Sequence, residues 1–120
     1  MSERKEAITN AISAHGMWKV KFRDFMAGKI DLDEKLVALP NQCDFGKWLE
    51  AGGKKLLSPT EHSDVWALHA EFHRVAASVI HAKKTGNVEA AKKALDLGGT
   101  FTTASAKLTA RMSELHHSSP

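Results

Sequence analysis

Three of the seven histidines and the only cysteine have the residue types and spacing of metal ligands. His69 and His73 lie four residues apart in the stretch HAEFH, so a helix would place both imidazoles on one face, with Cβ atoms about 6 Å apart. His15 lies on an apolar stripe near the start of the chain, and Cys43 opens the aromatic-rich stretch CDFGKW. Three imidazole nitrogens and one thiolate sulfur suit tetrahedral Zn²⁺. Hard cations such as Mg²⁺ and Ca²⁺ are disfavoured, whereas iron and copper stay open.

Each of these residues also has an ordinary structural explanation. A single histidine on an apolar face is usually a core residue with one hydrogen bond, and a single cysteine is often inert packing. The metal hypothesis gains weight because the helices that carry these residues must turn their apolar faces toward one core. An unpaired imidazole or thiolate there would cost on the order of a few kcal/mol of desolvation, which a shared ion would offset. The other histidines are expected to be solvent-exposed, the last two in a frayed terminus: His62, His81, His116 and His117.

Length and composition indicate one ordinary domain that spans residues 1–120. The apolar fraction is 42%, the charged fraction 26% and the net charge +3, values close to those of average soluble domains. No apolar run approaches the roughly 20 residues of a membrane span, and the start MSERKEAITN does not look like a signal peptide. With one cysteine and no basic block interleaved with aromatics, we expect a cytoplasmic protein with no disulfide, no membrane and no nucleic-acid partner.

Apolar residues recur at helical spacing over three long segments, residues 3–27, 58–84 and 87–115. Ser58, followed by proline and then Glu61, predicts a capping box at the start of the second of these, and Asn87 is expected to cap the third. Between the first two, short helices are expected at 32–39 and 43–51, interrupted at Pro40 and ended by Gly52-Gly53. No strand pattern occurs. The prediction is an all-α fold, an antiparallel four-helix bundle with a short broken second helical segment.

The last helix contains Gly98-Gly99. This pair either loosens the helix or lets a neighbouring segment approach closely. The sequence leaves both explanations open.

Three motifs in this order resemble the chemoreceptor zinc-binding (CZB) domain family: His15-x-x-Trp18, Cys43-x-Phe45-Gly46-x-Trp48 and His69-x-x-x-His73. The resemblance implies one zinc ion per chain, bound by His15, Cys43, His69 and His73. It also implies a regulatory domain of bacterial signalling. Family members are commonly homodimers that accompany chemoreceptors or diguanylate cyclases, and they report zinc or oxidants in chemotaxis or cyclic-di-GMP signalling. The natural-looking start favours a free-standing member over a piece of a longer protein.

Residue chemistry provides a route by which such a site would signal. Zinc holds Cys43 as the thiolate, which oxidants attack, and oxidation would remove the only sulfur ligand. The helix that carries it is short and contains Gly46, so it could detach and re-aim Phe45 and Trp48. In the ordinary explanation these aromatics, with Trp18, are core residues that shield the site. The two roles are compatible.

Three other functions compete with a sensor. Hydrolytic zinc needs an open ligand position and a nearby base, but Glu71 falls off the histidine face and four protein ligands leave no room for substrate, so we expect no enzyme. A hemerythrin-like di-iron bundle would need bridging carboxylates on inward positions, which the helices lack. A non-sensory interaction protein with a purely structural zinc stays open.

Overall fold

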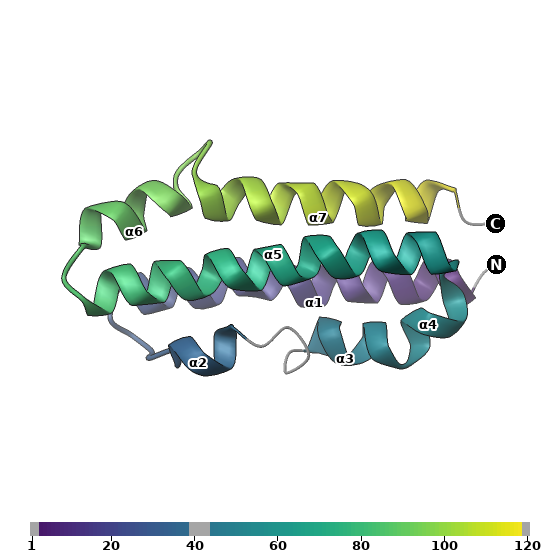
Figure 1. Ribbon diagram of the computed structural model, residues 1–120, viewed down its shortest axis with the longest axis horizontal. Helices are drawn as coiled ribbons and strands as arrows, with labels where there is room; N and C mark the ends of the chain where they lie inside the picture. The colour runs from purple at the N-terminus through teal and green to yellow at the C-terminus, as the bar shows by residue number, and fades with distance from the viewer. Residues whose placement is uncertain (1–2, 39–43, 119–120) are drawn as a thin grey trace.

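The computed structural model of the chain describes residues 3–38 and 44–118, and every regular element within those ranges is a helix. Figure 1 shows α1, α5 and α7 running along the long axis of the molecule, with α2, α3 and α4 in a broken row along one side. Helix α7 contacts both α1 and α5. The molecule measures 47 × 25 × 23 Å, and both termini lie at the same end. The elements are α1 Glu3–Met26, α2 Glu34–Val37, α3 Asp44–Glu50, α4 Gly52–Leu56, α5 Pro59–Lys84, α6 Val88–Leu95 and α7 Thr100–His117. The all-helical prediction is confirmed.

The start of α5 follows the capping chemistry expected from the sequence. The Ser58 hydroxyl accepts a hydrogen bond from the Glu61 N–H, and the Glu61 carboxylate accepts one from the Ser58 N–H at 2.9 Å. Arg4 of α1 donates to both oxygens of the same carboxylate, at 3.0 and 3.1 Å. The Ser58 N–H and the Arg4 guanidinium together lower the pKa of Glu61. The cap therefore also ties the first turn of α1 to the first turn of α5.

Removing this cap should have a measurable effect on stability. Ser58→Ala leaves the Glu61 N–H without its partner, and we expect the free energy of unfolding to fall by about 1 kcal/mol. Urea denaturation followed by circular dichroism measures the change. Ser13→Ala, an exposed position inside α1, is the matched control and should change stability by less than about 0.5 kcal/mol. Equal effects at the two positions would contradict the capping account.

Two expectations about glycine pairs need correction. Helix α3 ends at Glu50, before Gly52-Gly53, as expected, but the helical segment does not end there, because the pair begins the further helix α4. A Cβ at Gly52 would lie 3.2 Å from the Trp48 indole nitrogen, and one at Gly53 would lie 3.2 Å from the Trp48 carbonyl oxygen. Close packing on the preceding turn, rather than helix termination, therefore explains the glycines.

The second pair interrupts what was expected to be one continuous last helix. Asn87 caps α6 as expected, accepting from the Ala90 N–H at 3.3 Å, but α6 ends at Leu95 and α7 starts only at Thr100. Gly98 has a φ of +81°, and a Cβ at Gly99 would collide with backbone carbonyls of α6. Both of the open explanations thus hold, since the pair breaks the helix and also permits a close backbone approach.

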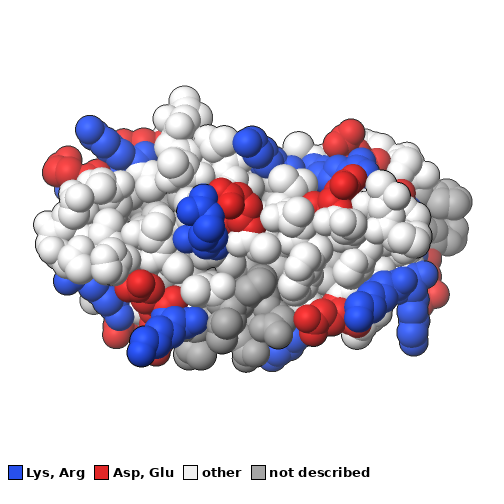
Figure 2. All heavy atoms as spheres, in the orientation of Figure 1, with Lys and Arg blue, Asp and Glu red and all other residues white. Residues whose placement is uncertain are grey.

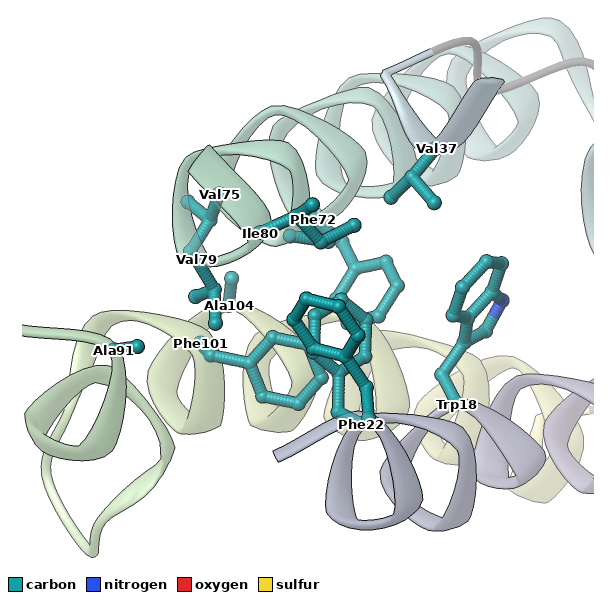
Figure 3. Packing of buried hydrophobic residues seen from close by; sticks show 12 residues of the cluster. Trp18, Phe22, Val37, Phe72, Val75, Val79, Ile80, Ala91, Phe101 and Ala104 are labelled. Carbon is teal, nitrogen blue, oxygen red and sulfur yellow. The ribbon is translucent and has the colours of Figure 1, made fainter. Parts of the chain in front are cut away.

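Two hydrophobic cores follow each other along the molecule. The aliphatic core includes Ile8, Leu49, Val65, Leu108 and Met112. The aromatic core includes Trp18, Phe22, Phe25, Phe72 and Phe101, and Figure 3 shows rings from α1, α5 and α7 converging in it.

The two cores meet at one level of the long helices. Along α1 the sequence passes from Ile8 in the aliphatic core to Trp18 in the aromatic core, and His15 falls between them. Along α5 it passes from Val65 to Phe72, and His69 falls between those two. The histidines are therefore placed where the two cores join.

Candidate metal centre

Three imidazoles are buried at this junction. His15 of α1 is 4% exposed, and His69 and His73 of α5 are 0% and 1% exposed. Within the described ranges they are the only buried side chains that titrate, and Ser105 is the only other buried polar one. Helix α5 reaches this depth because its apolar positions recur every three or four residues, and the histidines occupy that same stripe.

Aromatic rings hold the three imidazoles in one layer. The rings of His69 and His73 meet edge to face with centroids 4.5 Å apart. Phe72 packs on His15 at 4.5 Å, and Phe45 stacks on His69 at 4.6 Å while approaching His15 at 6.1 Å. His15 and His69 therefore share Phe45 as a neighbour, although they come from different helices.

Two hydrogen bonds orient the imidazoles. The His73 Nδ1–H donates to the Val37 carbonyl oxygen at 2.6 Å, which puts the lone pair of that ring on Nε2. His15 Nε2 and the Ser105 hydroxyl are 3.1 Å apart, and His15 Nδ1 is buried without a hydrogen-bond partner in the described part of the chain. Neither Ser105 nor the Val37 carbonyl was expected at the site from the sequence.

Burial keeps these imidazoles neutral. Desolvation lowers the pKa of His15 from 6.5 to about 4, with smaller contributions from His73 and Lys19. Desolvation also lowers the pKa of His73, against the opposing effect of its hydrogen bond to Val37. A neutral imidazole is the form that binds a metal, so both side chains are ready ligands at neutral pH.

The same shifts make the stability of the metal-free protein depend on pH. In the folded protein His15 stays neutral until pH falls to about 4, whereas in the unfolded chain it takes up a proton below its ordinary pKa of 6.5. The contribution of His15 to stability is therefore fully present above pH 6.5 and is lost as pH falls toward 4. For His15 alone the loss between pH 7 and pH 4 is about 3 kcal/mol. Urea denaturation in chelator at several pH values measures it. His15→Gln should show a shallower pH dependence, and an equal slope in both proteins would contradict this assignment.

The aromatic residues of the sequence motifs lie around the histidines. Trp18 presents its ring edge-on to His73 at 5.4 Å, and Phe45 is buried. Trp48 is half-buried and packs on Phe45 at 5.9 Å, while Gly46 is a buried residue of α3. Phe72, which contacts two of the three histidines, was not singled out from the sequence, although it lies between His69 and His73 on the core stripe of the same helix.

Cys43 lies outside the described residues. Within them, no three His, Cys, Asp or Glu side chains are arranged to hold a metal ion. The chemistry of the three histidines nevertheless fits a metal, because all three are buried, His69 and His73 are in ring contact, and His15 Nδ1 has no hydrogen-bond partner among the described residues. Cys43 precedes Phe45 by two residues, a span of at most about 7 Å of chain, and Phe45 stacks on His69.

Carboxylates do not contribute to this layer. Glu71 is exposed and pairs with Arg74 on the outer face of α5, as its position in HAEFH predicts. Among the Asp and Glu side chains that the structure describes, a set that does not include Asp44, none is buried. The described part of the site thus offers neither a general base nor a bridging carboxylate.

The remaining four histidines differ from expectation in two places. His81 is exposed as predicted and contacts Glu34, and His117 is exposed. His62, by contrast, is half-buried with Nε2 2.8 Å from the Leu49 carbonyl oxygen, because α3 and α4 fold back over the start of α5. His116 is also half-buried and, with His117, belongs to the regular last turn of α7 rather than to a frayed end.

The described elements are all helical, and three buried histidines lie where their two cores join. The family described as the chemoreceptor zinc-binding domain matches residues 15–80, more than half of the chain, and the chain belongs to that family. The match begins at His15 and contains His69 and His73. The family is one of zinc-binding domains in chemoreceptor-type signalling, so membership implies zinc binding. The comparisons with curated proteins and with solved structures found no match. No described helix is long and apolar enough to cross a bilayer.

Proposed function

We propose that this chain is a regulatory domain of bacterial signalling in which His15, Cys43, His69 and His73 bind one Zn²⁺. The observation that carries the proposal is the burial of three imidazoles at the junction of the two cores, where His15 and His69 share Phe45 as a neighbour and His69 packs on His73. Nitrogen and sulfur donors without oxygen donors favour zinc over Mg²⁺ or Ca²⁺. Four protein ligands would close the coordination shell, which suits a structural or regulatory ion better than a catalytic one.

The arrangement of helices suits a bundle built around this site. We propose that residues 1–120 form a single domain, an antiparallel four-helix bundle with α2 to α4 as the broken second helix and α6 with α7 as the fourth. The lengthwise alignment in Figure 1 supports this interpretation. Met17 and Val20, which are 55% and 38% exposed on α1, suit contact with a second copy of the chain, and the proposal includes a homodimer in the cytoplasm.

The proposed switch is helix α3. It has seven residues and is anchored near the histidines by Phe45, whose ring lies on His69. A hollow of about 270 Å³ lies beside the contact between α3 and α1; it is lined by Ala7, Asn10, Ala11, Ala14, Phe45 and Trp48. Oxidation of the Cys43 thiolate to the sulfenic acid, by a peroxide or hypochlorite, would remove the sulfur ligand at the start of this helix. Phe45 and Trp48 would then take up new positions. An output partner of the chemoreceptor or diguanylate cyclase type would recognise the changed surface.

Cys43→Ser tests both the proposed zinc site and the proposed oxidation switch. We expect zinc affinity to fall by about 100-fold or more and the hypochlorite-induced change in tryptophan fluorescence to disappear, because serine neither binds zinc as a thiolate nor forms a sulfenic acid. Ser63→Ala, at an exposed position of α5, is the matched control; it should keep both properties.

The outcomes separate the alternatives. Loss of zinc binding in the variant, together with no fluorescence response to oxidant in the wild type, would favour a purely structural zinc in an interaction protein. Unchanged zinc affinity and unchanged oxidant response in Cys43→Ser would overturn the proposal.

A further inference from the structure

A groove separate from the histidine layer opens between the C-terminal half of α1 and the corner where α6 meets α7. Its volume is about 820 Å³, within the range of roughly 300–1,000 Å³ that is usual for binding sites. Met26, Leu95 and Phe101 supply apolar surface to its wall. The groove therefore has an apolar surface that an incoming side chain could cover.

The rim of the groove carries an excess of positive charge. Lys19 and Arg23 line it from α1, one turn apart, and Lys92 and Lys93 line it from α6. None of the four forms an ion pair within the part of the chain that is described, whereas Arg4, Arg74, Lys84 and Arg111 elsewhere do. These four cations outnumber the two carboxylates of the lining, Glu89 and Asp96. The unbalanced charge would attract carboxylates of a binding partner.

A projecting apolar side chain lies directly beside the groove. The loop between α6 and α7 stands out from the long axis of the molecule (Figure 1), and the tip of the projection at that place is white in Figure 2. Leu97 in this loop is 98% exposed, the highest value among the exposed large hydrophobic side chains. A shallow hollow next to it shares Lys93 and Asp96 with the groove. Leu97 therefore adds exposed apolar area next to the apolar wall of the groove.

We propose that the groove and Leu97 form a docking surface for an acidic amphipathic peptide segment of a partner protein. Carboxylates of the segment pair with the four rim cations, and one of its apolar side chains covers Phe101 and its neighbours in the groove. Nucleic acid fits less well, because it offers no aliphatic side chain for the apolar wall and its phosphates would meet Glu89 and Asp96. The surface goes beyond zinc binding, since none of the three buried histidines lines it.

Fluorescence anisotropy with a labelled synthetic peptide tests the proposal. The probe is a helix-forming peptide of about 15 residues with glutamates and leucines on opposite faces. We expect it to bind the full chain, with an affinity that weakens as salt is raised. A peptide with lysine for glutamate, and one with serine for leucine, should each bind at least about tenfold more weakly. A single-stranded oligonucleotide that binds more tightly than the acidic peptide would overturn the proposal.

Matched variants locate the binding surface. Lys92→Glu with Lys93→Glu should weaken peptide binding about tenfold or more, and Leu97→Ser should weaken it several-fold. Lys54→Glu with Lys55→Glu makes the same charge change on α4 and should leave binding unchanged. All variants alter exposed positions, and circular dichroism checks that they stay folded. Absence of peptide binding up to about 1 mM, or equal losses in the two double variants, would overturn the proposal.

Discussion

His69→Gln is expected to weaken zinc binding by about 100-fold. His69 is fully buried between His73 and Phe45, and glutamine keeps most of its volume while removing the imidazole. Zinc sites with four ligands contribute roughly 10–16 kcal/mol of apparent binding free energy, so one ligand accounts for about 3 kcal/mol. Every 1.4 kcal/mol corresponds to tenfold in affinity. Competition against a chromophoric chelator at neutral pH measures the change.

The control for this variant lies on the same helix. His81→Gln removes an exposed histidine that contacts Glu34 at the surface, and it should leave zinc affinity unchanged. A His69→Gln protein that stays folded and binds zinc as tightly as His81→Gln would remove His69 from the ligand set.

Phe72→Ala is expected to lower the free energy of unfolding by about 3–5 kcal/mol. Phe72 is fully buried and packs on Phe101 at 5.2 Å and on Trp18 at 6.2 Å in the aromatic core. It also contacts His15 at 4.5 Å and His73 at 5.4 Å, so its removal loosens the layer that positions the imidazoles. Zinc affinity should therefore fall as well, although no ligand is lost.

Urea denaturation in the presence of chelator measures the stability of Phe72→Ala without a contribution from metal. Val88→Ala, which trims a partly exposed side chain at the start of α6, should change stability by less than about 0.5 kcal/mol. A loss below about 1 kcal/mol in Phe72→Ala would mean that the aromatic core does not hold α5 against its neighbours as described.

Features set by local chemistry were predictable from the sequence. The capping box of Ser58 and Glu61 involves residues three apart, so its motif alone predicts the start of α5. The break at Gly98-Gly99 was not predictable in the same way. Glycine propensity allows either a weak helix or a turn, and the turn depends on the backbone of α7 folding back against α6. The fold-back of α3 and α4 that covers His62 is likewise a tertiary contact with no local signal.

Some features of the histidine site were likewise predictable from the sequence, and others were not. The burial of His15, His69 and His73 followed from their positions on apolar stripes. Ser105 carried a signal that went unused, because it is a polar residue on the stripe of Phe101, Leu108 and Met112 in the last helix. The carbonyl of residue 37, which accepts from His73, left no signal at all, since any residue type supplies a backbone oxygen.

Metal analysis of the purified wild-type chain tests the central claim most directly. We expect one zinc per chain, retained against a chelator at neutral pH and released as pH falls, because protons compete with the metal for the buried imidazoles. Native mass spectrometry gives the stoichiometry, and chelator competition at several pH values gives the affinity. Two irons per chain, or a folded protein that neither carries zinc nor takes it up, would contradict the account.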